Sequence, residues 1–131
     1  MIVLDTHVWV WWVSDPRELS ARSRRLIEES RGKNAVYISS ISVWEVALLV
    51  ARNRLKLRIS TADWIARSEA LPFLNFVPVD NQIAFRSASL PEPLHSDPAD
   101  RIIIATAVSH DATLISKDEK ILGYPHVRAT W

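Results

Sequence analysis

The chain opens with MIVLDTHVWVWW, residues 1–12, and the fifth residue of this stretch decides how the fold is interpreted. Ile2–Leu4 is a short run of branched apolar residues, which is typical of a strand buried on both faces of a parallel sheet. Asp5 follows directly, although aspartate is uncommon in strands and is rarely buried without a partner. Asp5 therefore either caps the next helix or stands at the strand tip as a functional carboxylate.

The bulk composition indicates a globular protein. The chain has 131 residues, of which 48% are hydrophobic and 24% are charged, and we expect one domain over residues 1–131. The net charge is only +1, so any surface that attracts nucleic acid must be local. The absence of cysteine excludes disulfides, thiolate nucleophiles and cysteine zinc sites. The apolar stretches contain Asp5 or Glu45 and fall short of the roughly 20 residues of a membrane span, so we expect a cytoplasmic protein without membrane contact.

Predicted strands and helices alternate along the chain. Beyond Ile2–Leu4, the pattern predicts strands at Ala35–Ser39, Asn75–Val79, Thr113–Ser116 and, weakly, His126–Thr130. It predicts helices over His7–Val13, from Ser20 to Gly32, from Ser40 or Ser42 to Val50, from Ser60 or Thr61 through Ile65, over Asn81–Leu90, and from Pro98 to about His110. This alternation indicates an α/β fold with a parallel sheet, whose right-handed crossovers place helices on both faces.

Several carboxylates fall where such a sheet binds ligands, beyond the carboxyl ends of its strands. Asp5 follows the first strand and Asp118 follows the fourth. Glu45 lies in the first turns of the helix after the second strand, and Asp97 and Asp100 open the helix before the fourth. We therefore expect these acids to meet at one edge of the sheet.

Each acid also has a purely structural interpretation, which the sequence leaves open. Asp97 and Asp100 have the spacing of a capping pair at a helix start, and Asp118 has that of a surface turn residue. Glu45 is less easily explained, because it lies on the apolar helix ISVWEVALLV. Such a carboxylate requires a partner, either an arginine such as Arg101 or a metal ion.

A converging set of carboxylates indicates a metal site. Two carboxylates about 4 Å apart repel each other by ~4 kcal/mol at an effective dielectric constant of about 20. They stay ionised together only if a cation joins them. Without cysteine or an HExxH pair, the available ligands are oxygens, which suit Mg²⁺ or Mn²⁺ rather than zinc. An oxygen-ligated site of this kind favours phosphoryl chemistry.

Four stretches resemble, in chain order, the motifs of the PIN domains, and in particular those of the VapC-like ribonuclease toxins of bacterial toxin–antitoxin pairs: IVLDTHVWVWW (2–12), SSISVWEVALL (39–49), LHSDPADRIIIATA (94–107) and TLISKD (113–118). The resemblance implies a three-layer PIN-like fold, with a parallel sheet in the order 3-2-1-4-5 and helices on both faces. It also implies an RNA substrate, a small antitoxin that blocks the site, and a homodimer.

The resemblance further implies that Asp5, Glu45, Asp100 and Asp118 are the catalytic residues and hold one or two Mg²⁺ or Mn²⁺ ions. Asp97 matches an accessory acid of one subgroup. The fourth motif of the family often has Thr or Asn before its acid, where this chain has Ser116 and Lys117.

The implied mechanism is attack of metal-activated water on the phosphodiester, which leaves 5′-phosphate ends. Thr6 and Ser116 are candidates for hydroxyls that orient the carboxylates. His7 and His95 are less favoured as bases, because the metal already activates the water.

Local basic residues are the candidates for contacts with RNA phosphates. Arg52, Arg54 and Lys56 lie together in RNRLKLR (52–58), and Lys117 is beside a predicted ligand. A solvated basic turn is an equally good interpretation of any one of them.

The six tryptophans divide into two expected groups. At helical spacing, Trp9, Trp12 and Trp44 are expected in the core. Trp11 and Trp64 are expected in an exposed groove for a partner helix.

Two other functions compete with a nuclease. A receiver-like signalling domain also has an acidic Mg²⁺ site, but it needs an acidic pair after strand 1, where this chain has Asp5 alone, and it does not explain Glu45 on a helix. An inactive PIN-like module that binds RNA or protein is the other alternative, and the presence of all four acids argues against it.

Overall fold

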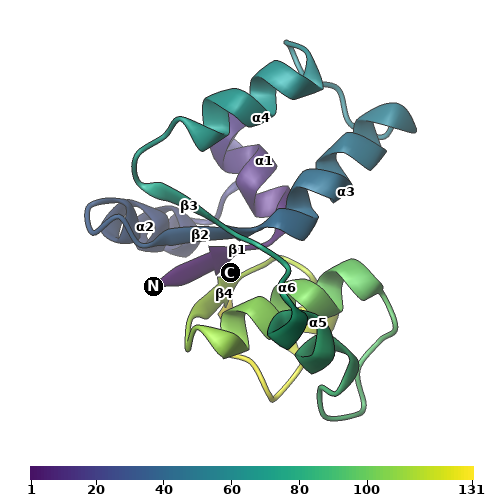
Figure 1. The fold of residues 1–131 in the computed structure, drawn as a ribbon. Helices are drawn as coiled ribbons and strands as arrows, with labels where there is room; N and C mark the ends of the chain where they lie inside the picture. Colours follow the sequence, from purple (N-terminus) through teal and green to yellow (C-terminus); the bar gives the residue numbers. More distant parts are fainter.

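The computed structural model describes residues 1–131 and has one five-stranded parallel sheet (Figure 1). The strands are β1 (Ile2–Leu4), β2 (Val36–Ser39), β3 (Leu74–Val77), β4 (Thr113–Ile115) and β5 (Ala129–Thr130). Their order is β3-β2-β1-β4-β5 and every neighbouring pair is parallel, which confirms the expected topology. The third strand ends at Val77 and not at Val79, because Pro78 has no N–H for the ladder.

The helices are α1 (Thr6–Ser14), α2 (Ala21–Arg31), α3 (Ser40–Ala51), α4 (Thr61–Glu69), α5 (Asn81–Ala88), α6 (Pro98–Ser109) and α7 (Glu119–Leu122), with a short 3₁₀ helix at Pro16–Glu18. The helices expected from the sequence are all present. The 3₁₀ helix and α7 were not predicted, because one turn is too short to show helical periodicity. No helix has both the length and the apolar character needed to cross a bilayer.

Serine and aspartate caps define where the helices begin. The Ser20 hydroxyl accepts a hydrogen bond from the Ser23 amide at 3.0 Å, and the Ser60 hydroxyl accepts one from the Asp63 amide at 3.1 Å. Helix α3 begins at Ser40 as expected, but its cap is Ser39, whose hydroxyl accepts from the Ile41 amide. Gly32 ends α2 in a right-handed conformation, so its role as a stop does not use the left-handed region open to glycine.

Helices cover both faces of the sheet, and alternate residues of β1 face different cores. Ile2 and Leu4 join a buried cluster with Trp9 of α1, and with residues of α2, α3 and α4. Val3 joins a second cluster with Ile103 of α6 and with α7. In Figure 1, α1, α3 and α4 lie on one side of the strands and α5 and α6 on the other. The carboxyl ends of β1 and β4 therefore emerge between two helical layers.

Two tryptophans lie elsewhere than expected. Trp9 is fully buried, with its ring centroid 4.7 Å from that of Trp64, which is itself only 5% exposed and not in an open groove. Trp44 is 54% exposed and does not belong to the core. Helix α3 is apolar on nearly every side, so its periodicity did not reveal which side faces the sheet.

Candidate metal centre

Asp5 both caps α1 and stands at the acidic edge of the sheet. One carboxylate oxygen accepts a hydrogen bond from the Thr6 amide at 2.8 Å, and the other accepts one from the Ser116 hydroxyl at 2.7 Å. Asp5 is buried, and its own amide donates to the carbonyl of Ile115 at the end of β4. The capping and functional interpretations of Asp5 are thus compatible in this structure.

Ser116 connects the ends of β1 and β4. Its buried hydroxyl donates to Asp5 and accepts a hydrogen bond from the Asp118 amide at 3.0 Å. Asp118 in turn caps α7, with Oδ1 accepting from the Lys120 amide at 2.8 Å. One serine hydroxyl therefore fixes the relative positions of two of the expected acids.

Glu45 reaches the same edge from α3 and is held by a hydroxyl. Thr6 Oγ1 lies 2.6 Å from Glu45 Oε1 and 2.8 Å from Ser42 Oγ. Since a hydroxyl carries one proton, Thr6 donates it to the carboxylate and accepts from Ser42. Ser42 is fully buried, and from the sequence it was expected only as a possible start of this helix. The hydroxyl of Thr6 thus fixes the orientation of the Glu45 carboxylate.

Arg101 is not the partner of Glu45, so that alternative is wrong. Its guanidinium bonds to Glu92 Oε1 at 2.8 Å and to the carbonyls of Leu94 and His95, both at 2.9 Å. Arg101 therefore braces the irregular segment before α6. Glu45 is left without a cationic side chain among its hydrogen-bond and ion-pair partners.

Asp97 is a helix cap, whereas Asp100 contacts His95 and does not act as a cap. Asp97 caps α6, with its carboxylate accepting from the Asp100 amide at 2.9 Å. Asp100 does not reach back to complete a capping box, because its Oδ2 lies 2.7 Å from His95 Nε2. His95 Nδ1 is buried without a partner, so the ring proton is best placed on Nε2, from where it is donated to Asp100.

His95, Asp100 and Asp118 come together at metal-ligand spacing. Each offers one ligand atom, and these atoms all lie within 4.8 Å of one another. From its sequence context, His95 was expected only as a less favoured base. Its position five residues before Asp100 did not predict this contact, because the intervening segment is irregular.

The carboxylates raise one another's proton affinity. Burial raises the pKa of Asp5 above its usual range, against hydrogen bonds from Ser116 and Thr6. Burial, with the charges of Asp5, Asp100 and Asp97, raises the pKa of Glu45 to about 7. Burial, with the charges of Asp5 and Asp97, also raises the pKa of Asp100. The cluster therefore resists full ionisation at neutral pH unless a cation binds.

The donor set fits a hard divalent cation. Asp5, Glu45, Asp100 and Asp118 offer carboxylate oxygens, and no arginine or lysine forms an ion pair with any of them. Oxygen donors suit Mg²⁺ or Mn²⁺, and His95 contributes by donating its Nε2 proton to Asp100. Hydroxyls from Thr6 and Ser116 orient two of the carboxylates, as expected from the sequence.

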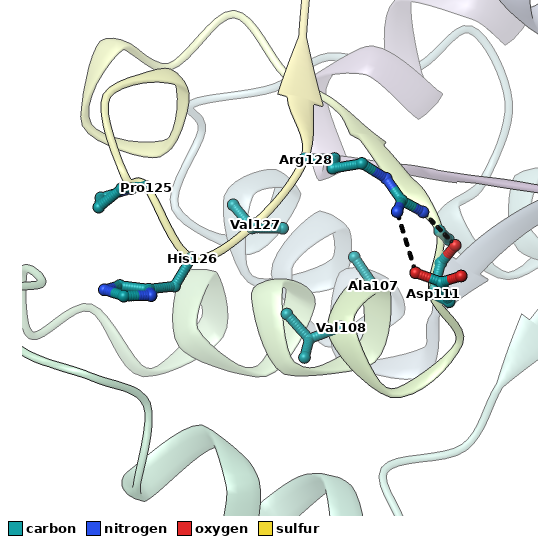
Figure 2. A pocket seen from close by; sticks show the side chains of 8 residues that line it. Ala107, Val108, Asp111, Pro125, His126, Val127 and Arg128 are labelled. Carbon is teal, nitrogen blue, oxygen red and sulfur yellow. Dashed lines mark hydrogen bonds and ion pairs between the residues drawn. The ribbon is translucent and has the colours of Figure 1, made fainter.

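A different pocket lies at the opposite edge of the sheet, where β4 begins. It has a volume of about 280 Å³, and Figure 2 shows His126, Val127 and Arg128 among its lining residues. Its one carboxylate, Asp111, pairs with Arg128 at 3.0 Å. This pocket has no converging acids and is separate from the acidic edge.

The basic residues fall into two places. Arg52, Arg54 and Lys56 are exposed on the turn after α3. Lys117 lies at the acidic edge, with its ammonium nitrogen 5.7 Å from the ring centroid of Trp11. The structure thus brings Lys117, but not the turn, into contact with residues of this edge.

Comparisons with known proteins identify the family of the chain. A family model described as the PIN domain matches residues 2–126. Ribonuclease VapC22 of Mycobacterium tuberculosis (strain ATCC 25618 / H37Rv) is 31% identical over 127 residues, covering 97% of this chain and 94% of the relative.

Solved structures share the fold over nearly the whole chain. FitAcB from Neisseria gonorrhoeae has a TM-score of 0.72 at 25% identity, covering 100% of this chain and 97% of that one. VapBC2 from Rickettsia felis, bound to a DNA fragment from the promoter, has a TM-score of 0.72 at 19% identity, with coverage of 99% and 98%. A toxin–antitoxin complex from Klebsiella pneumoniae has a TM-score of 0.64 at 23% identity, with coverage of 97% and 95%.

Glu45→Gln should flatten the pH dependence of stability of the metal-free protein. The pKa of Glu45 rises from 4.5 to about 7 on folding, so its neutral form stabilises the fold below about pH 4.5 and this stabilisation is lost as the pH rises through about 7. Allowing for partial solvent screening, we expect the parent to lose about 1–2 kcal/mol more than the variant between about pH 5 and pH 8. Urea unfolding in EDTA at both pH values measures this, and equal losses in the two proteins would contradict it.

His95→Ala should weaken metal binding about 10- to 100-fold, because Asp100 loses the donor that orients it. His95→Gln should retain most of the affinity, since its amide can donate from a similar position. Thermal melts across a Mn²⁺ titration measure both. The exposed His126→Ala is the control. The same Mn²⁺ dependence in the Ala variant as in the parent would show that His95 does not orient Asp100.

Proposed function

The chain belongs to the PIN-domain family, and on this premise we propose that it is a Mg²⁺- or Mn²⁺-dependent endoribonuclease and the toxin of a toxin–antitoxin pair. The single observation that carries the proposal is a set of neighbouring carboxylates at one sheet edge, Asp5, Glu45, Asp100 and Asp118, none of which forms an ion pair with an arginine or lysine. Such a cluster is unfavourable as a structural element and is explained by a bound cation.

In the proposed mechanism the four carboxylates hold the metal. A divalent ion bound there supplies an activated water and neutralises charge on the phosphodiester. Thr6 holds Glu45, Ser116 holds Asp5, and His95 holds Asp100, so each of these acids has a neighbour that fixes its rotamer. With water as the attacking group, the 2′-hydroxyl of RNA is not consumed and the products carry 5′-phosphates.

We propose an RNA substrate held by local positive charge. Arg52, Arg54 and Lys56 are exposed, and the side chains of this turn form no ion pair that would compete with phosphates. Lys117 adds a cation beside the acids themselves. Because the net charge is only +1, binding depends on these local contacts.

We also propose protein partners, namely an antitoxin and a second copy of the chain. Support for the antitoxin comes from the toxin–antitoxin complexes among the structural neighbours. Trp44 on α3 and Phe85 on α5 are large apolar side chains that are 54% and 76% exposed, but they lie on opposite sides of the sheet and do not form one surface for a partner.

The two alternatives have less support. An inactive module that binds RNA or protein does not require that hydroxyls orient both Asp5 and Glu45, as Ser116 and Thr6 do. A receiver-like domain does not account for Glu45 on α3 at the acidic edge.

Cleavage of labelled RNA should require Mg²⁺ or Mn²⁺, stop in EDTA, and give 5′-phosphate and 3′-hydroxyl ends. Asp5→Asn should lower the rate at least about 100-fold, because it removes a charged ligand. The exposed Asp63→Asn on α4 is the matched control. Cleavage that persists in EDTA, or products that end in 2′,3′-cyclic phosphate, would rule out the proposed mechanism.

Replacing both Arg52 and Arg54 by Ala should weaken RNA binding and reduce the slope of log affinity against log salt by about one to two. Single-turnover cleavage at saturating RNA should persist, since neither residue is near the acids. Fluorescence anisotropy over a salt series measures the effect. The exposed Lys33→Ala, in the turn after α2 and without an ion pair, is the control. If affinity and salt slope stay unchanged, this turn does not contact RNA.

A further inference from the structure

A cavity of about 380 Å³ opens directly beside the acidic edge. It is lined by six residues: Asp5, His7, Val8, Trp11, Lys117 and Asp118. Two of these are proposed metal ligands, and the others come from α1 and from the segment after β4. A molecule in this cavity would therefore contact the metal site and the aromatic wall at the same time.

The aromatic wall is held in place before any ligand binds. His7 and Trp11 are one helical turn apart on α1, with ring centroids 5.8 Å apart. Trp131 packs edge-on against Trp11, at 5.8 Å between centroids. The ammonium nitrogen of Lys117 lies 5.7 Å from the Trp11 ring centroid and 5.9 Å from that of Trp131. Trp11 thus loses little freedom when a flat ligand packs against it.

The chemistry of the wall selects a flat ligand that carries negative charge. Trp11 is half-buried and His7 is exposed, so part of the aromatic surface is accessible to a ligand, and the flexible Lys117 side chain over the Trp11 ring can move to admit it. Lys117 is the only cation of the cavity and is exposed. An aliphatic anion would use the lysine but not the rings, and a neutral apolar segment would use the rings but leave Lys117 unmatched. A nucleotide uses both, because its base stacks and its phosphate pairs with the lysine.

We propose that this cavity is a nucleotide subsite, which takes one unstacked base of single-stranded RNA next to the phosphate at the acidic edge. The inference rests on the proposed nuclease function and adds the residues, Trp11 and Lys117, that would hold one nucleotide of the RNA. In a duplex the bases are stacked on one another, so a base face is not free to meet Trp11. Because every base has an aromatic face, Trp11 itself favours an unpaired nucleotide without selecting its identity.

The test is binding of short fluorescein-labelled oligouridylate and oligoadenylate by the full chain in Ca²⁺, with gels to confirm that the RNA stays intact. Trp11→Leu should lower the affinity about tenfold or more, which corresponds to ~1.4 kcal/mol, and Trp11→Phe should retain most of it. Lys117→Ala should lower both the affinity and the salt slope. The exposed Phe85→Leu on α5, outside the cavity, is the control.

An abasic scan keeps the test independent of how well the variants fold, because Trp11 also packs partly against the core. One abasic position in the oligonucleotide should weaken binding to the parent and cause no further loss in Trp11→Leu. An undiminished abasic effect in Trp11→Leu would overturn the subsite. So would duplex RNA that binds as tightly as the single strand and with the same dependence on Trp11.

Failure of the subsite is distinguishable from failure of the proposed function. A parent protein that cleaves no RNA in Mg²⁺ or Mn²⁺ removes the nuclease proposal. A parent that cleaves RNA, together with a Trp11→Leu variant of unchanged affinity and KM, removes only the subsite. If that variant instead shows weaker self-association in sedimentation at unchanged RNA affinity, the cavity belongs to an interface between copies of the chain, which also overturns the proposal.

Discussion

Removal of several neighbouring carboxylates from water is the constraint on which the acidic edge depends. Asp5, Glu45 and Asp100 all have raised pKa values, with burial as the largest cause and the charges of neighbouring carboxylates as a further one. A protein stabilised only for folding would place an arginine here, and Arg101 is nearby in sequence. The chain instead directs Arg101 to Glu92 and to backbone carbonyls, so the acids stay uncompensated. The fold therefore leaves negative charge at this edge that a bound cation can neutralise.

Neutral donors hold the acids without neutralising them. Hydroxyls of Thr6 and Ser116 fix Glu45 and Asp5, and helix starts receive Asp5, Asp97 and Asp118 as caps. Capping and metal binding are compatible because each carboxylate oxygen has two lone pairs, so an oxygen that accepts one hydrogen bond can still bind a cation. The positive ends of the helices partly offset the negative charge. The positions that looked structural in the sequence are thus the same ones that organise the site.

The sheet order and the edge at which the acids meet followed from the sequence, because short apolar strands followed by acids obey general rules of parallel sheets. Where a helix is apolar on all sides, the sequence could not predict which side is buried, as the exposed Trp44 on α3 shows. Contacts of residues in irregular segments also could not be predicted from the sequence. The approach of His95 to Asp100 depends on the path of the segment before α6, which the Arg101 guanidinium fixes through hydrogen bonds to the carbonyls of Leu94 and His95. Periodicity carries no information about such a path.

Helix α1 couples the metal centre to the neighbouring cavity. Its N-cap is Asp5, its first residue is Thr6, and its next two turns present His7 and Trp11 to the cavity. The helix is anchored by Trp9, which is fully buried against Trp64 and Phe76, so it cannot rotate without opening the core. A shift of α1 would therefore displace an acid, a hydroxyl and the aromatic wall together. Placing all three on one rigid element would keep the proposed nucleotide in register with the carboxylates, which loops attached separately would not ensure.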